Sequence, residues 1–389
     1  MNILSGIPYW WLSGFYFFYF ALVGALNPYL GLYFSDIGLT AYEIGLINAV
    51  FIGTKIVAPN VWGWLCDYTG QRLRIITLGS FLATLFFSGM FFWETLLPLL
   101  IVTFLYSFFW NAILSQFDTV TVQYLSKDSH HYSHIRVWGS IGFIVSVVLL
   151  GFVFDLISIR YLIPVSWGLL LFIWLSGLRV KEPPKNAVES DHHHWLEVVK
   201  RPMVVAFLAA AFLLQFGFGA YYSFFSLYLE NYHYSRSMIG LLWALGVVAE
   251  VLLFVVMHKI MPRVGVAYLL FWSLLLTAIR WFLTAYYVDH LWVLIFSQCI
   301  HALSFGACHA ACIELIRCFF KGKNAGQGNA LYSSMTFGLG GALGAFSSGL
   351  LWDINPKQLF VVSGLALLLA AAIVWVGLCT KNRYESLNR

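Results

Sequence analysis

Long apolar stretches recur along the whole of this 389-residue chain, and they constrain its fold more than any other feature. Each has about 18–25 residues, enough to cross roughly 30 Å of hydrocarbon as a helix. Hydrophobic residues make up 61% of the chain and charged residues 10%, a composition that excludes a water-soluble domain. We therefore predict an all-α integral membrane protein with twelve spans, near residues 9–33, 44–66, 73–93, 96–123, 134–154, 160–178, 203–229, 238–258, 264–287, 291–316, 328–351 and 358–379.

The only long polar segment separates the sixth predicted span from the seventh. It covers residues 179–202, and we interpret it as a cytoplasmic linker between two six-helix bundles, residues 1–178 and 203–389. The halves also repeat each other: Leu32, Tyr33, Ile44 and Gly45 recur 195 residues later, and Gly142, Gly151 and Asp155 recur 198 residues later. Such a parallel duplication is typical of secondary transporters. The alternative is coincidence among glycine-rich helices, where small residues serve close packing.

Lysine and arginine are distributed unevenly among the loops. If both termini lie on one side, that side receives 17 of the 22 Lys and Arg residues, the other side 3, and two fall within spans. Because cytoplasmic loops are enriched in these residues, we predict that both termini are cytoplasmic. The net charge of +5 thus reflects topology and indicates no nucleic-acid partner. The amino terminus is predicted to be a retained helix rather than a signal peptide, and the six cysteines are not expected to form disulfides.

Three residues that are costly in a bilayer lie inside successive spans of the second half: Glu250, Arg280 and His301. A charged group at the bilayer centre costs roughly 2.5–3.5 kcal/mol on insertion scales, so such residues usually face the bundle interior and mark a pathway. At ~1.5 Å per residue, Arg280 lies about 10 Å, His301 about 15 Å and Glu250 about 20 Å from the outer end. We expect His301 to bridge a Glu250–Arg280 ion pair that handles protons. The alternative is a static cluster that holds three helices together.

His309 is a candidate second relay station for the proton. It lies eight residues after His301, rotated by about 80° and roughly 12 Å deeper on an ideal helix; the alternative is a packing role. Cys308 and Cys312 beside it have a helical spacing that could hold a metal, but packing of small thiols is the preferred interpretation. The histidines at 192–194 lie in the polar linker and are interpreted as solvated. We therefore predict no metal site and no cofactor.

The first half contributes candidate substrate-binding residues. Lys55 lies about 18 Å from the outer face without an obvious acid at its depth, which favours an anionic substrate such as a carboxylate; the alternative is that Lys55 snorkels. Asp118 and Arg136, at about 33 Å and 28 Å, can pair, although Arg136 also fits a positive-inside residue. Asn27 precedes Pro28, which should kink the first helix and free a carbonyl inside the cavity or serve structure alone.

Aromatic residues make up 19% of the chain, and some of them flank the charged trio. Tyr222 and Trp243, with Tyr221, Phe225 and Trp281, could line an apolar cavity suited to an aromatic substrate. For any single one of these side chains, packing between helices is the competing interpretation.

The connection between the second and third spans, GWLCDYTGQRLR, resembles the loop signature of the major facilitator superfamily. The matching residues are Gly63, Asp67, Gly70 and Arg72, whereas Tyr68 and Leu73 stand where basic residues are usual. Glycine serves a tight turn, and the acid and base can pair with neighbouring helix ends. The resemblance implies a gating loop and a fold of two pseudo-symmetric six-helix bundles.

A narrower resemblance covers nearly the whole chain. GFYFFYF, DIGLTAYEIGL, IRVWGSIGF, LWALGVVAEV, AIRWF and HALSFGACH are similar to the phenylpropionate permease type of bacterial transporter, which is related to the lactose/proton symporters. The resemblance implies that Glu250, Arg280 and His301 serve substrate binding and proton coupling, with Asp118 and Arg136 at further sugar-site positions. One departure is that Ser304 and Phe305 stand where the sugar symporters carry a Glu after the histidine.

The function that we expect is proton-coupled import of a small organic solute, with an aromatic carboxylate favoured over a sugar or nucleoside. Its partners would be the substrate, protons and the lipid of a bacterial inner membrane, and the protein is expected to be a monomer. An intramembrane enzyme would need a catalytic constellation that the sequence lacks, and a channel would more often show rings of pore-lining charge. A membrane sensor that binds solute without moving it stays an alternative.

Overall fold

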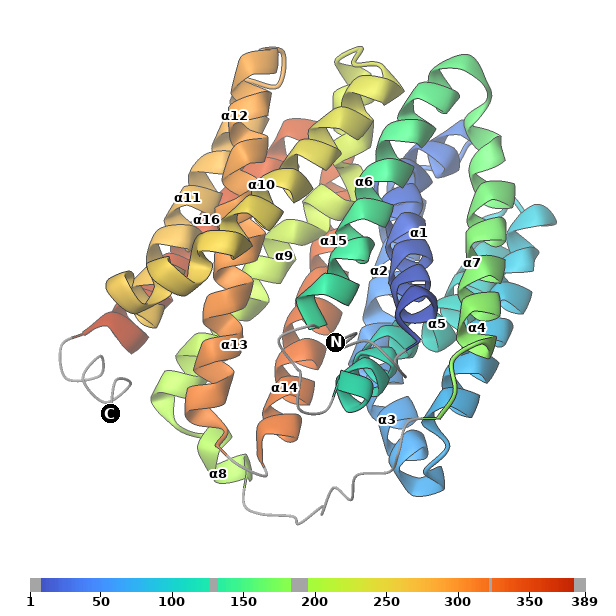
Figure 1. Ribbon diagram of the computed structural model, residues 1–389. Coiled ribbons are helices and arrows are strands. Elements are labelled where there is room, and N and C mark those ends of the chain that lie inside the picture. The colour runs from blue at the N-terminus through green and yellow to red at the C-terminus, as the bar shows by residue number, and fades with distance from the viewer. Residues whose placement is uncertain (1–7, 126–131, 183–194, 322–323, 381–389) are drawn as a thin grey trace. The chain divides into compact units, whose positions relative to one another are not determined.

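The described residues are mostly helical and contain no strand (Figure 1). The computed structural model describes residues 8–125, 132–182, 195–321 and 324–380. Within these ranges, eleven helical stretches are long and apolar enough to cross a membrane: Tyr9–Asp36, Ala41–Thr69, Arg72–Phe91, Leu96–Leu125, Tyr132–Leu156, Ile159–Leu178, Pro202–Asn231, Arg236–Val264, Val266–Tyr286, Leu291–Phe319 and Pro356–Cys379. They confirm the predicted all-α membrane fold.

The remaining predicted span, 328–351, is also helical but is less apolar. It runs through α14 (Ala325–Ser333), a π-helical turn (Ser334–Gly340) and α15 (Gly341–Trp352). Glycine and serine are frequent in this stretch. Its order along the chain and its bounds agree with the prediction.

The chain forms two compact units. The first comprises Met1–Thr40, Thr54–Val188 and Ser235–Leu241, and the second comprises Ala41–Gly53, Glu189–Tyr234 and Leu242–Arg389. The first contains α1 (Tyr9–Asp36), α3 (Ala58–Thr69), α4 (Arg72–Phe87), α5 (Leu96–Leu125), α6 (Tyr132–Leu156) and α7 (Leu162–Leu178), with 3₁₀ turns at Thr54–Ile56, Ser88–Phe91 and Ile159–Tyr161. Helix α1 packs against α6 and α7 and continues unbroken through Pro28.

The second unit surrounds α9 (Pro202–Asn231), which packs against α15 and α16. Its other elements are α2 (Ala41–Gly53), α8 (Trp195–Val199), α10 (Arg236–Val264, of which the first residues belong to the first unit), α11 (Val266–Tyr286), α12 (Leu291–His301), a π-helical segment (Ala302–Ala307), α13 (Cys308–Phe319), α16 (Pro356–Val374) and a terminal π-helical turn (Trp375–Cys379).

The duplicated sequence positions make equivalent contacts inside each unit. A Cβ atom built on Gly142 of α6 would lie 2.1 Å from the carbonyl oxygen of Phe17 in α1, and one on Gly340 would lie 2.6 Å from that of Phe212 in α9. In the second unit, Gly45 of α2 packs in the same way against Ala345. Glycine therefore lets paired backbones touch at the repeated positions. The division into bundles 1–178 and 203–389 with a linker at 179–202 stays a prediction.

Alanine at Gly142 is expected to destabilise the protein by about 1–3 kcal/mol, because its methyl group would overlap the Phe17 carbonyl. Thermal unfolding of detergent-purified protein would measure the loss. The matched control is Gly168→Ala in α7, where nothing lies within 4 Å of the added methyl group, and helix propensity there favours alanine by about 1 kcal/mol. Equal melting temperatures for the two variants would show that the close approach has no energetic weight.

Candidate functional site

Four neighbouring helices of the second unit bring together five polar side chains that are buried or nearly buried. Helix α9 supplies Tyr221, α10 supplies Glu250, α11 supplies Arg280, and α12 supplies Gln298 and His301. Gln298 and His301 are three residues apart in α12 and therefore share one face of the helix. Four of these side chains are buried and that of Glu250 is 16% exposed, so they point into the bundle rather than to lipid.

Arg280 is fully buried and is held mainly by aromatic ring faces. Its guanidinium carbon lies 4.3 Å from the centroid of Trp281 and 4.6 Å from that of Tyr221, contacts that stabilise a desolvated cation. Its Nη2 donates a hydrogen bond to Oε1 of Gln298 at 3.3 Å. Nε and Nη1 have no hydrogen-bond partner among the described residues. Part of the guanidinium fork is therefore available to an acceptor.

Gln298 joins Arg280 to Tyr221. Its Oε1 accepts from the Tyr221 hydroxyl at 3.1 Å as well as from Arg280, and its side chain is fully buried. Within the described part of the chain, the amide Nε2 of Gln298 and the indole Nε1 of Trp281 have no partner. With the two Arg280 nitrogens, the cluster thus holds four buried N–H-bearing atoms without acceptors. Each unpaired buried donor costs about 1–3 kcal/mol.

Glu250, the acid of the site, lies beside His301. The carboxylate Oε2 of Glu250 lies 3.9 Å from Nε2 of His301, and the two side chains are 16% and 8% exposed. The predicted ion pair between Glu250 and Arg280 is wrong for this structure, because no ion pair of Arg280 occurs among the residues described. Gln298 and the aromatic rings take up the positions around the guanidinium. His301 therefore does not bridge Glu250 and Arg280, and of these two residues it pairs with Glu250 alone.

A phenylalanine separates the two histidines of the predicted relay. Phe305 stacks on His301 with centroids 6.0 Å apart and on His309 with centroids 5.8 Å apart, and the three rings are nearly parallel. The π-helical segment Ala302–Ala307 brings these rings onto one face, although an ideal α-helix rotates them apart. Direct proton transfer between the imidazoles is blocked in this arrangement. His309 also borders a small crevice, together with Gln215, Ser304 and Tyr332, that has no room for a water molecule.

The predicted aromatic residues do gather beside the polar cluster. Trp243 is buried, donates from Nε1 to Ser226 Oγ at 3.0 Å and lies 4.4 Å from the ring of Tyr221. Tyr222 is partly exposed and stacks on Trp243 at 6.2 Å and on Phe218 at 5.5 Å. These contacts place an aromatic wall next to Arg280. Whether Tyr222 and Trp243 also touch substrate stays a prediction.

The candidate residues of the first half lie in the first unit, and Asp118 and Arg136 are linked through Tyr16 rather than by an ion pair. Asp118 accepts hydrogen bonds from Tyr16 at 2.6 Å and Tyr132 at 2.8 Å. The Arg136 guanidinium lies over Phe20 at 4.0 Å and over Tyr16 at 5.4 Å. Both phenols donate to Oδ1 of Asp118, and the arginine stacks on aromatic rings instead of bridging to this carboxylate.

Lys55 and Asn27 are both partly buried in the first unit. Lys55 lies in the 3₁₀ turn Thr54–Ile56, and none of the ion pairs found among the described residues includes it. Asn27 lies in α1 next to Pro28. Their proposed contacts with substrate stay predictions.

The predicted gating loop has the expected turn and ion pair. Gly70 ends α3 with φ of 62°, a left-handed conformation that suits glycine. Arg72 pairs with Asp67 at 2.6 Å and also donates to Gln116 of α5, whose side chain lies next to Gly63. The loop thereby ties the ends of α3 and α4 to α5. Its role in gating stays a prediction.

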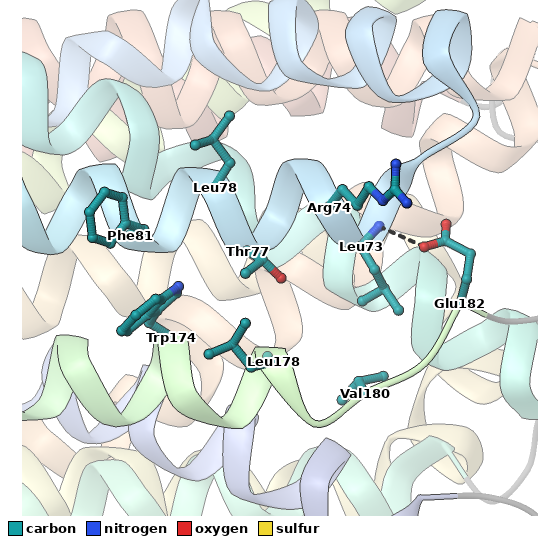
Figure 2. A pocket seen from close by; sticks show the side chains of 10 residues that line it. Leu73, Arg74, Thr77, Leu78, Phe81, Trp174, Leu178, Val180 and Glu182 are labelled. Atoms are coloured by element: carbon teal, nitrogen blue, oxygen red, sulfur yellow. Dashed lines mark hydrogen bonds between the residues drawn. The ribbon is translucent and has the colours of Figure 1, made fainter.

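A larger hollow lies elsewhere, at one end of α4 and α7 in the first unit. It is an open groove of about 550 Å³ whose walls include Phe81 and Trp174, with Arg74 and Glu182 at its polar end (Figure 2). Glu182 accepts a hydrogen bond from the backbone N–H of Leu73 at 3.3 Å. The groove contains none of the residues predicted to bind substrate or protons.

The structure offers no metal centre within its described residues, since no group of three or more His, Cys, Asp or Glu could hold an ion there. Cys308 and Cys312 are fully buried free thiols. The histidines at 192–194 lie outside the described residues.

Gln298 is the site residue that sequence reasoning missed. A glutamine within an apolar span carries no charge and gives a weak signal in a hydropathy pattern. The available clue was its spacing, one helical turn before His301 and thus on the same face of α12.

Comparisons with known proteins agree with this architecture. A model of the MFS_1 like family matches residues 9–362. A probable 3-phenylpropionic acid transporter of Escherichia coli K12 is 27% identical over 371 residues, covering 92% of this chain and 95% of that protein. A maltose permease of Geobacillus stearothermophilus is 26% identical, covering 92% and 93%.

Solved structures share the fold at low sequence identity. The nucleoside transporter NupG superposes with a TM-score of 0.80 at 16% identity, covering 97% of this chain and 99% of that one. A bacterial homologue of the human lysosomal transporter Spinster, inward-facing and unoccupied, gives 0.72 at 13% identity, with 99% of each chain covered.

Proposed function

Since the chain belongs to the MFS_1 like family of membrane transporters, we propose that it is a proton-coupled symporter that imports a small aromatic carboxylate by alternating access. The protein is an integral membrane transporter rather than an enzyme. The proton, the substrate class and the direction are the new elements of this proposal. The proton and the substrate class are supported by the chemistry of the site around Arg280, and the direction is supported by the charge of the loops.

The observation that carries the proposal is the surplus of buried donors around Arg280. Four nitrogens lack acceptors among the described residues, namely Nε and Nη1 of Arg280, Nε2 of Gln298 and Nε1 of Trp281. A carboxylate supplies two oxygens that accept from an arginine fork, so it would satisfy the donors that the protein leaves unpaired. A neutral solute with few acceptors would leave them unsatisfied.

The aromatic part of the substrate is supported by the rings beside this cluster. Phe218, Tyr221, Tyr222 and Trp243 form stacked, tilted and edge-on ring contacts next to Arg280. Aromatic side chains favour offset or edge contacts with further rings. The relative named for 3-phenylpropionic acid fits a solute with a ring and a carboxylate. A sugar is the second candidate, because the maltose permease is nearly as similar in sequence; a nucleoside is a third.

Proton coupling follows from charge balance in a site of low dielectric. Arg280 and Glu250 bring one positive and one negative charge to the same cluster. A carboxylate substrate adds a second negative charge, which is costly to bury unless a proton arrives with it. Glu250 and its neighbour His301 are the groups that can take up this proton. We infer that one proton accompanies each substrate anion.

We further propose that the protein acts in a bacterial inner membrane with both termini in the cytoplasm. The excess of Lys and Arg in the loops on the side of the termini supports this orientation. Protons and substrate would then enter together from outside, driven by the proton gradient without a bound cofactor. Neither proton uptake nor carboxylate binding requires a second copy of the chain, so we propose a monomer.

The decisive experiment is substrate-induced alkalinisation of a weakly buffered suspension of cells that express the protein. We expect 3-phenylpropionate to raise the external pH, whereas maltose and a nucleoside leave it unchanged. Counterflow in proteoliposomes then separates a carrier from a sensor, since only a carrier exchanges labelled solute. Alkalinisation by maltose alone would replace the proposed substrate class, and the absence of counterflow with every solute would favour a sensor.

A further inference from the structure

We propose that Gln298 sets the charge selectivity of the Arg280 site, because its amide positions the guanidinium without neutralising it and offers Nε2 to the substrate's carboxylate. This inference rests on the proposed function. It adds a selectivity-determining residue to the trio of charged and titratable groups, and it assigns a reason for an uncharged side chain at that position.

The orientation of the Gln298 amide is fixed by its neighbours. Arginine can only donate hydrogen bonds, and Arg280 lies 3.3 Å from one terminal atom of the amide, so that atom must be the oxygen. The Tyr221 hydroxyl, 3.1 Å away, donates to the same oxygen. The other terminal atom is therefore Nε2, a donor that has no partner among the described residues. It carries two N–H groups into the cluster where Arg280 also has unused donors.

The lack of charge on Gln298 matters because Arg280 is otherwise without an acidic partner in the described residues. Nη2 of Arg280 donates one hydrogen bond to Oε1 of Gln298, and the ring faces of Tyr221 and Trp281 fix the plane of the guanidinium. The full positive charge of Arg280 thus stays available to an incoming anion. A carboxylate at position 298 would have nearly the same shape but would pair with the guanidinium and compete with the substrate.

A packing role explains these contacts less well. The side chain of Gln298 is fully buried, and an unpaired buried amide is costly. An apolar side chain of similar size would fill the same volume without that cost. An amide at this position is explained if Nε2 binds the substrate during transport. One carboxylate oxygen of the substrate would then accept from Nε2, and the other would accept from Arg280.

The test compares binding of 3-phenylpropionate with that of its neutral amide, 3-phenylpropionamide, to purified full-length protein. We expect the original protein to prefer the carboxylate strongly. In Gln298→Glu the new acid should neutralise Arg280, so carboxylate affinity should fall on the order of 100-fold while amide affinity changes little. The preference for the anion would then collapse. Because an acid facing a buried arginine gains a partner, this variant should fold, and substrate-free protein should melt at a higher temperature.

Two further variants separate selectivity from packing. Tyr221→Phe removes one hydrogen bond to Oε1 but leaves the amide uncharged, so it should weaken binding only a few-fold and keep the preference for the anion. Gln298→Leu should weaken carboxylate binding roughly 10-fold through loss of Nε2, again with the preference kept. An unchanged carboxylate-to-amide ratio in Gln298→Glu would overturn this inference alone. Failure of the original protein to bind any carboxylate would instead overturn the proposed function.

Discussion

Replacement of Arg280 by glutamine is expected to lower carboxylate transport on the order of 100-fold. Arg280 is the only cation among the contacts described for this cluster, and its Nε and Nη1 have no partner within the described residues. Removing one partner of a buried, hydrogen-bonded charge pair costs about 2–5 kcal/mol. The loss should appear in the apparent affinity of proteoliposomes for labelled 3-phenylpropionate.

Lysine at the same position is the matched control for charge. It keeps the positive charge but lacks the planar fork that binds a carboxylate through two parallel hydrogen bonds. Arg280→Lys should therefore recover only part of the lost affinity. Full activity of the lysine variant would show that a point charge suffices, and normal affinity of Arg280→Gln would exclude this residue from the substrate site.

Thermal stability distinguishes a substrate-binding role from a structural one. A buried cation without an acidic partner is a cost to the substrate-free protein, so glutamine should leave the melting temperature unchanged or raise it. If Arg280 instead held the helices together, its removal should lower the melting temperature. The two roles thus predict opposite shifts for one variant, measured without substrate.

Hydropathy was enough to predict the helices and their order. Each span must satisfy its backbone hydrogen bonds internally, so twenty apolar residues in a row leave few alternatives to a helix. The repeat was also visible, because glycines such as Gly142 and Gly340 permit the same backbone contact in each unit. The helices depend on local sequence, and the repeated backbone contacts depend on glycine, which has no side chain.

The partners of the polar residues could not be predicted in the same way. The depth estimates placed His301 between Arg280 and Glu250, but side-chain rotation and the rings of Tyr221 and Trp281 decide which groups meet. The π-helical segment after His301 likewise altered the phase of the helix and inserted Phe305 between two histidines. Depth along a helix gives only the position of a residue along the helix axis, whereas a hydrogen bond also depends on the direction and conformation of the side chain.

Substitution of Glu250 by glutamine is expected to abolish uphill accumulation while sparing exchange of substrate across the membrane. The glutamine side chain cannot take up a proton, but it has almost the same size and can still contact His301. It also removes the negative charge that opposes binding of a carboxylate, so substrate should bind without a co-transported proton. Movement of the loaded carrier would continue, and its coupling to the gradient would be lost.

The measurement compares two modes of transport in the same proteoliposomes. An imposed inward proton gradient should drive accumulation by the original protein but not by Glu250→Gln, whereas counterflow without a gradient should proceed in both. Glu250→Asp serves as the control, since it keeps a titratable group and should retain part of the accumulation. If Glu250→Gln still accumulates substrate at the normal rate, the proton is carried elsewhere. His301 would then be the next group to test, because it is the other titratable side chain at 3.9 Å from this carboxylate.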